Sequence, residues 1–380
     1  SKQLGSRRPV RRSVSNVPWT TCKEKRHRVF ESIKMPIRIC RFDFRPLLFL
    51  LCAAVFSWDG SSAVAERVLT VSPEGPLRSI AEARDEIRKL RRDEAVRVVV
   101  ADGVYPISAA IVFTPEDSGT AEAPVIYEAA PTARPVISGG KSIGDFAVQP
   151  DGTWTTNVDP EWQFEQLWVN GRRAVRAREP DSFFFYLRNA RETSGKTEEA
   201  NPRPIARQTL DADPNDLSTL RDLSDSERER AQILLFHKWD NTRKFLDDVD
   251  IESGKLRISG GKMKSWNPLT RNTAYVLENF RAALDEPGEW FLDGDGTLHY
   301  FPRPGERPDQ CVVVAPAADR LIEIAGDPAA GRFVEHLTFR GLAFQHTLWA
   351  TPRDGFEPMQ AAASIEAAIQ IDGARHVTFD

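Results

Sequence analysis

A short internal repeat near the end of the 380-residue chain is the feature that most constrains its fold. The segment Leu321-Ile-Glu-Ile-Ala-Gly326 matches Ala368-Ile-Gln-Ile-Asp-Gly373, and each copy is followed by a His-x-Thr-Phe unit, at 336–339 and at 376–379. Short apolar strands that recur and end in glycine are typical of a solenoid, in which each coil buries its side chains against the next. The repeat therefore predicts stacked β-coils over residues 313–380.

Ahead of the repeat, the sequence predicts one helix and several short strands. Apolar residues at spacings of three and four indicate an amphipathic helix over residues 76–94. Strand signals follow at 97–100, 125–128 and 135–138, and proline or glycine bounds these short runs. Because the open end of a solenoid needs a cover, we expect residues 66–149 to form a capping helix and the first coils.

Residues 150–312 differ from these coils, since they carry six of the nine tryptophans and longer polar stretches. Two strand-like runs, 290–293 and 297–301, flank a Gly-Asp-Gly turn and predict a β-hairpin. We interpret 150–312 as a β-rich insertion, within which 192–226 forms a polar and partly helical excursion. No closing element follows the last coil, so we expect the solenoid to continue beyond Asp380.

The net charge of −4 averages two unlike pieces, +9 over residues 1–65 and −13 over the remainder. Residues 35–65 contain a basic stretch, a short apolar run and a small-x-small site, which together predict a secretory signal peptide cleaved after Ala65. Residues 1–34 show no apolar periodicity and are interpreted as an upstream gene-model extension. A nucleic-acid-binding arm would be expected to carry interleaved aromatic residues, which this segment lacks. We therefore expect a secreted or periplasmic protein that meets a membrane only through its signal peptide and binds no nucleic acid.

Metal and cofactor motifs are absent from the sequence. Cleavage after Ala65 would leave Cys311 as the single cysteine, which excludes an internal disulfide and zinc sites built on cysteine. The six histidines include no His-Glu-x-x-His motif. Residues 293–296 resemble the start of a calcium loop but lack its later acidic ligand. We expect neither a metal nor a cofactor.

Two segments of the insertion look familiar: Phe164 to Pro180, which begins Phe-Glu-Gln-Leu-Trp-Val-Asn-Gly, and Leu277 to Asp293, which begins Leu-Glu-Asn-Phe. Both resemble segments of exported right-handed parallel β-helix repeat proteins, and so do 79–105 and 336–346. Over residues 68–380 the chain is similar to β-helix enzymes of the glycoside hydrolase family 141 type. The resemblance implies a mainly β, pectin lyase-like fold: a right-handed parallel β-helix with an N-terminal capping helix, an inserted β-rich subdomain and missing C-terminal coils.

The same resemblance implies a secreted glycoside hydrolase that degrades plant or algal polysaccharide with two carboxyl groups. We expect the protein to be a monomer. In similar enzymes the catalytic acids are expected on later coils, so we assign no catalytic residue and expect these acids beyond Asp380. A polysaccharide lyase on the same fold and a non-catalytic carbohydrate-binding protein stay open as alternatives. The charge of −13 disfavours a polyanionic substrate unless a local basic cleft exists.

Two groups of side chains are candidates for contact with the polysaccharide or an oligosaccharide. The first offers an aromatic platform and planar hydrogen-bond donors within seven residues. The second stands where a coil breaks into an irregular stretch, and loops on rigid scaffolds often bind ligands. Arginines at 172–178 could meet acidic sugars, but we interpret them as a surface face. The candidates are His237, Trp239, Asn241 and Arg243 in the first group, and His346 and Trp349 in the second.

Overall fold

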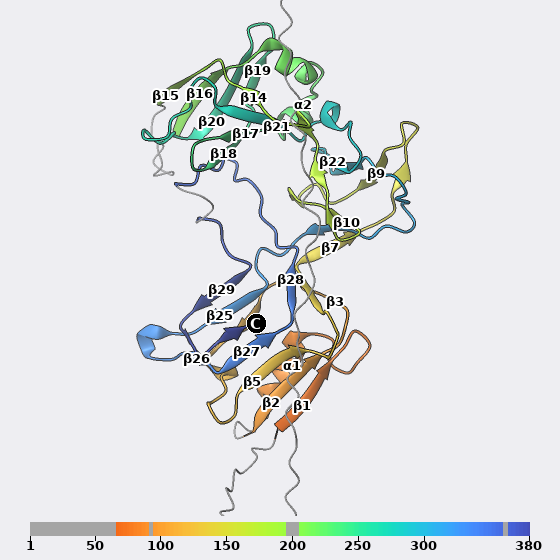
Figure 1. Ribbon diagram of the computed structural model, residues 1–380, viewed down its shortest axis with the longest axis vertical. Helices are drawn as coiled ribbons and strands as arrows, with labels where there is room; N and C mark the ends of the chain where they lie inside the picture. Colours follow the sequence, from red (N-terminus) through yellow and green to blue (C-terminus); the bar gives the residue numbers. More distant parts are fainter. Residues whose placement is uncertain (1–65, 91–93, 195–204, 360–363) are drawn as a thin grey trace, which may run out of the picture. The chain divides into compact units, whose positions relative to one another are not determined.

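Short β-strands make up most of the chain in the computed structural model, which describes residues 66–90, 94–194, 205–359 and 364–380 (Figure 1). The predicted upstream extension and signal peptide, residues 1–65, lie outside the described residues. None of the helices in the described ranges is long and apolar enough to cross a membrane. The expectation of a mainly β protein is confirmed.

Three of the sheets are entirely parallel and combine strands from both ends of the described chain (Figure 1). The first contains β1 (Glu66–Val71), β2 (Ala95–Val100), β5 (Val125–Ala129), β27 (Leu337–Arg340) and β31 (Thr378–Phe379), the second β3 (Val104–Pro106), β6 (Val136–Ser138) and β28 (Ala343–Gln345), and the third β4 (Ile111–Phe113), β25 (Ile322–Ala325) and β29 (Ile369–Asp372). A shorter parallel pair joins β26 (Val334–Glu335) to β30 (Ala374–Arg375). Each successive set of strands along the chain thus adds one strand to each of these sheets in turn.

The internal repeat seen in the sequence is confirmed by strand pairing. Strand β25 pairs in parallel with β29, and β27 with β31, so that the two copies lie in register. The rings of Phe339 and Phe379 stack with centroids 4.7 Å apart, and those of His336 and His376 lie at the same distance. Equivalent residues of the two copies therefore pack directly on one another.

Side chains that alternate along these strands form the core between the parallel sheets. In β2 every second residue is buried, as expected for a strand with one face turned inward. The rings of Phe113, Tyr127 and Phe339 meet in the middle with centroids 5.2–5.5 Å apart. Ile80 and Ala83 of α1 (Ile80–Ile87) join the same apolar cluster, so the helix is packed against the parallel sheets.

From β7 (Gly140–Ile143) to β24 (Val313–Pro316) the strands pair almost entirely in antiparallel fashion. The ends of this part meet, because β7 pairs with β24 and the amides of Ala317 and Ala318 both donate to the carbonyl of Gly139 at 2.8 Å. The predicted hairpin is confirmed, since Trp290 pairs with Tyr300 across β22 (Glu289–Leu292) and β23 (Thr297–Tyr300).

Four sheets make up this antiparallel part. Among their described strands, β12 and β22 form the only parallel pair. The remaining strands are β10 (Trp168–Val169) and β11 (Arg172–Arg173) beside β24; β8 (Ala147–Val148), β9 (Trp154–Asn157) and β12 (Val175–Arg176) with β22 and β23; β13 (Arg178–Glu179), β14 (Phe185–Tyr186), β17 (Gln232–Phe236), β18 (Asn241–Phe245) and β21 (Ala274–Glu278); and β15 (Asn189–Ser194), β16 (Ile205–Asp211), β19 (Asp248–Asp250) and β20 (Lys255–Gly261). Parallel and antiparallel sheets thus occupy separate stretches of sequence.

Two local predictions differ from the structure. The helix α1 is shorter than the predicted 76–94, because Ser79 caps it by accepting from the amide of Glu82 at 3.1 Å, and Leu77 forms a β-bridge with Val71 instead. The stretch 192–226 contains, besides the short helix α2 (Asp225–Arg228), the seven-residue strand β16. This strand is stabilised by partners on both sides, β15 and β20, which local composition does not reveal.

Gly326 and Gly373 end the two copies of the repeat, and the backbones of the two copies touch there. A Cβ added to Gly326 would lie 2.1 Å from the carbonyl oxygen of Gly373, and Gly373 has a φ of +64°. A side chain at Gly326 would push the backbones of the two copies apart. The glycines of the repeat are thus required by close stacking.

We predict that Gly326→Ala destabilises the protein by about 1–3 kcal/mol through this overlap. Gly144→Ala is the matched control, because a Cβ added at Gly144 meets nothing within 4 Å. Thermal unfolding followed by circular dichroism measures both variants. Equal melting temperatures for the two variants would contradict the close packing of the two repeat copies at Gly326.

Candidate functional site

A cavity of about 290 Å³ lies between the antiparallel part and the segment that follows β28. Its walls combine apolar side chains with planar polar and charged ones, as is common in ligand sites. The lining residues are Gln163, Phe164, Glu165, Arg176, Arg230, Gln232, Phe245, Asn279, Leu292, Ala350, Thr351, Pro352 and Arg353.

Strand register places several of the polar groups on one face of a sheet. Gln232 at the start of β17 pairs with Phe245 of β18 on one side and with Glu278 of β21 on the other. Arg243 lies two residues before Phe245 in β18 and therefore points to the same face. Directly opposite residues in an antiparallel sheet share a face, so the pairing brings an amide, a guanidinium and a carboxylate together.

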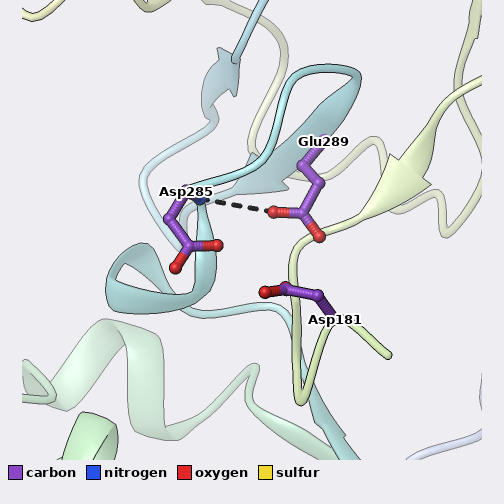
Figure 2. Close-up of side chains that lie close together, drawn as sticks. All are labelled: Asp181, Asp285 and Glu289. Atoms are coloured by element: carbon purple, nitrogen blue, oxygen red, sulfur yellow. Dashed lines mark hydrogen bonds between the residues drawn. The ribbon is translucent and has the colours of Figure 1, made fainter. Parts of the chain in front are cut away.

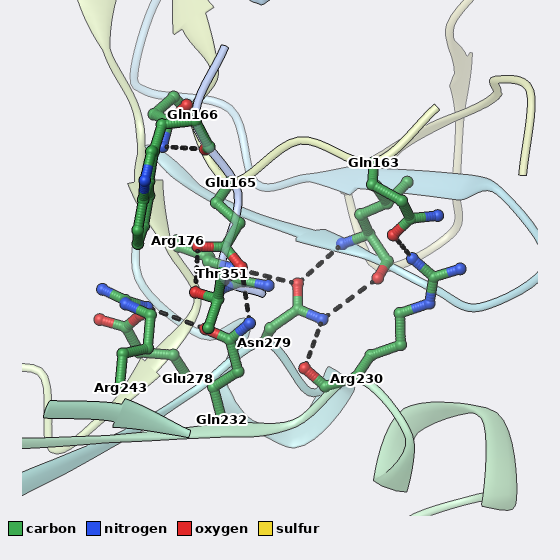
Figure 3. A network of polar contacts seen from close by, with 12 residues as sticks. Gln163, Glu165, Gln166, Arg176, Arg230, Gln232, Arg243, Glu278, Asn279 and Thr351 are labelled. Atoms are coloured by element: carbon green, nitrogen blue, oxygen red, sulfur yellow. Dashed lines mark hydrogen bonds and ion pairs between the residues drawn. The ribbon is translucent and has the colours of Figure 1, made fainter. Parts of the chain in front are cut away.

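These groups and three from outside the sheet form a continuous polar network (Figure 3). Glu165 accepts hydrogen bonds from the Gln232 Nε2 at 2.6 Å and the Thr351 hydroxyl at 2.9 Å. The Gln232 Oε1 in turn accepts from Arg176 at 2.8 Å and from Arg243 at 3.0 Å. Gln232 thus links the two halves of the network.

The carboxylates of the network are matched by guanidinium groups. Arg176 lies 3.7 Å from Glu165, and Arg243 forms an ion pair with Glu278. Burial alone would raise the pKa of Glu165, but the charges of Arg176 and Arg243 outweigh it and hold the pKa below its usual value. Glu165 is therefore ionised at neutral pH and acts as a hydrogen-bond acceptor.

Thr351 reaches the network because the segment after β28 is fastened to the antiparallel part at several points. The Gln166 side-chain amide donates to the backbone carbonyl of Trp349 at 3.0 Å. The backbones of Arg243 and Phe356 exchange two hydrogen bonds, of 2.9 and 2.8 Å. The cavity is thus closed on one side by the segment that follows the parallel strand β28.

The residues proposed from the sequence are dispersed by the structure. Arg243 belongs to the network, whereas Trp239 is 62% exposed and Asn241 is exposed at the start of β18. His237 lies 3.0 Å from the Thr242 hydroxyl, and burial lowers its pKa. The seven-residue cluster therefore does not converge on one point.

The second proposed group lies on the segment that follows β28. The ring of Trp349 packs edge-on against Phe356, with centroids 5.1 Å apart. The His346 Nδ1 lies 2.8 Å from the Ser138 hydroxyl, its ring contacts Trp168, and burial lowers its pKa. Both residues hold the segment that carries Thr351, but neither lines the cavity.

Sequence reasoning missed most of the network, although a signal was available. Glu165 and Arg176 fall within the segment 164–180, and Glu278 within 277–293, the two stretches that carry the resemblance to β-helix enzymes. Arg176 was assigned to a surface face, but its side chain is buried between Glu165 and Gln232. A search for polar residues inside those two segments would have found three members of the network.

A second group of acidic residues lies elsewhere, at Asp181, Asp285 and Glu289 (Figure 2). One carboxylate oxygen from each lies within 4.8 Å of the others, and Glu289 is buried whereas the aspartates are exposed. Burial raises the pKa of Glu289 to about 8, and the charges of Asp181 and Asp285 act in the same direction. Glu289 is therefore largely protonated at neutral pH. None of the three residues lines the cavity.

Comparisons with known proteins give one informative match. No protein-family profile and no curated protein matches the chain. A solved structure described as a glycoside hydrolase aligns over 78% of this chain with 26% identity and a TM-score of 0.64, and this chain spans 53% of that protein's length. A complex of XylC with xylose aligns over 76% of this chain and 36% of the XylC chain, with 13% identity and a TM-score of 0.31. This TM-score is too low to support an argument. The chain therefore has a glycoside hydrolase-like fold.

We predict that Thr351→Val loosens the segment around the cavity. The substitution removes a hydrogen-bond donor from an ionised carboxylate, which lowers stability by about 1.5–3 kcal/mol. We therefore expect faster amide hydrogen exchange over residues 349–353. Thr209→Val in β16 is the control, since Thr209 is half-buried and lies outside the network. Unchanged exchange in Thr351→Val would show that the contact with Glu165 does not hold the segment.

The raised pKa of Glu289 predicts a pH dependence of stability. Between the usual glutamate pKa, 4.5, and about 8 the folded protein keeps a proton that the unfolded chain has lost, so stability falls as pH rises through this window. Glu289→Gln should flatten this fall, and melting temperatures at pH 5 and pH 8 measure it. Glu122→Gln, at an exposed site, should keep the wild-type slope. A wild-type slope in Glu289→Gln would contradict the assignment.

Proposed function

We propose that this protein is a carbohydrate-active enzyme of the glycoside hydrolase type, built on a right-handed parallel β-helix. Support for the β-helix comes from three parallel sheets to which successive strands are added in the same order, and from the stacking of like residues between coils. The glycoside hydrolase neighbour supports the class of activity. Within this proposal α1 caps the first coil.

The observation that carries the proposal is the mixed lining of the cavity. Phe164, Phe245 and Leu292 offer apolar surface, whereas Glu165 and Asn279 offer planar polar groups. A sugar ring needs this combination, because its faces are largely apolar and its edge carries hydroxyls. A volume of about 290 Å³ is near the lower end of the range for ligand pockets, which suits a single sugar residue of a longer chain.

Glu165 is assigned a role in sugar binding. An ionised carboxylate held by Arg176 and Gln232 accepts hydrogen bonds from hydroxyls, but it is not a proton donor at neutral pH. Hydrolysis by two carboxyl groups, as in the family 141 type of enzyme that the sequence resembles, remains part of the proposal. Plant or algal polysaccharide is the proposed substrate, and export through the signal peptide before Glu66 is the proposed route to it.

A polysaccharide lyase is the second candidate, and one observation favours it. Arginines 176, 230 and 353 all line the cavity, and a lyase needs positive charge beside a uronate. The two activities differ in their products, since a lyase leaves an unsaturated uronate that absorbs ultraviolet light, whereas hydrolysis leaves a saturated reducing end.

The test is a panel of plant and algal polysaccharides incubated with the full-length protein, with reducing sugar and ultraviolet absorbance measured together. We expect reducing sugar without new absorbance from at least one of them. New absorbance would favour the lyase. Oligosaccharide binding with no product would favour a binding protein, and neither binding nor product would overturn the proposal.

Phe245→Ala tests the cavity itself. Loss of the aromatic wall should weaken oligosaccharide binding about 10-fold, equivalent to ~1.4 kcal/mol, as measured by isothermal titration calorimetry. Phe183→Ala is the control, because Phe183 is exposed and lies outside the cavity. Equal affinity of Phe245→Ala and the wild type for the oligosaccharide would show that the sugar does not bind in this cavity.

A further inference from the structure

Two of the cavity's arginines lack the carboxylate partners that the buried network provides. Arg230 donates to the side-chain carbonyl of Gln163 and, at 3.3 Å, to the backbone carbonyl of Gly294. Arg353 donates to the backbone carbonyl of Glu229 at 3.4 Å and lies over the ring of Phe245, 5.4 Å from its centre. Among the described residues, no carboxylate lies within 4.0 Å of either guanidinium.

These two positive charges oppose each other. Burial lowers the pKa of Arg230, and the charge of Arg353 lowers it further. Asp293, Glu229 and Glu161 attract Arg230 from longer range, without forming an ion pair. Arginine nevertheless keeps its proton in proteins, so the cavity holds two like charges that an anion would neutralise.

The other charges of the cavity do not cancel this pair. Glu165 is the one carboxylate in the lining, and Arg176 and Arg243 already compensate it. The cavity lining is therefore positive, although residues 66–380 carry a net charge of −13. A positive site on an acidic protein is selective, because the rest of the surface repels the same ligand.

We propose that the cavity accepts an acidic sugar residue, whose carboxylate or sulfate group lies between Arg230 and Arg353 while its ring packs against Phe245. Guanidinium groups suit this role, since their paired donors match planar or tetrahedral oxyanions. The inference rests on the proposed carbohydrate function and adds the substrate class to it. It also supplies the local basic cleft without which the charge of the protein would disfavour an acidic polysaccharide.

The test compares matched ligands by isothermal titration calorimetry on the full chain. The acidic probes are an oligogalacturonide and a sulfated galactose oligomer, and the neutral probes are the methyl-esterified oligogalacturonide and the unsulfated oligomer. We expect one acidic probe to bind at least ~10-fold more tightly than its neutral match, the scale of a charge-assisted hydrogen bond. The pair of probes that shows this preference identifies whether the site recognises a carboxylate or a sulfate group.

The variants Arg230→Gln and Arg353→Gln should each lower that preference about 10-fold, and Arg172→Gln should leave it unchanged, since Arg172 is exposed and lies outside the cavity. Arg353 is exposed, so its variant answers the question even if Arg230→Gln fails to fold. The inference is overturned if neither variant changes the preference, or if Arg172→Gln lowers it equally.

The failure of this inference is distinguishable from failure of the proposed function. Equal or tighter binding of the neutral probes would overturn the acidic site while supporting a carbohydrate site. Binding of no probe, with reducing sugar still released from the polysaccharide panel, would likewise overturn only the acidic site. Binding of no probe and no product would overturn both.

Discussion

Strands β5 and β27 pair in parallel although the whole antiparallel part lies between them in the sequence. This pairing requires the chain to leave the parallel sheets and return to them at one place, which is where β7 pairs with β24 beside Gly139. The same constraint places the segment after β28 next to the antiparallel part. Without this return of the chain, Thr351 would not contact Glu165, and the cavity would not form.

The buried network then determines the chemistry of the cavity. Removing paired charges from water is costly, so a buried ion pair is by itself weak evidence for stability, whereas removing one partner leaves an uncompensated buried charge. Here Gln232 accepts from Arg176 and Arg243, and each arginine faces one glutamate. The outcome is an ionised Glu165 held in one orientation, which suits the recognition of hydroxyl groups and leaves little capacity for proton donation.

Two buried glutamates illustrate how strongly position controls charge. Glu165 has two guanidinium groups within reach and stays ionised, whereas burial and the charges of Asp181 and Asp285 raise the pKa of Glu289, which keeps its proton. The neighbours of each arginine likewise determine whether its charge is compensated. Arg176 and Arg243 are neutralised inside the protein, but Arg230 and Arg353 are left for an outside partner.

The sequence by itself determined the mainly β character, the stacked repeat and the 290–300 hairpin, because strand periodicity and glycine turns are local properties. It also identified Arg243 as a candidate, since a guanidinium beside aromatic residues is visible in a short window. It did not identify Glu165, Gln232 and Thr351 as one site. These residues come from distant segments, and only the register of β17 with β18 and β21 and the return of the chain after β28 bring them together. Contacts of that kind depend on tertiary pairing, which a local pattern does not encode.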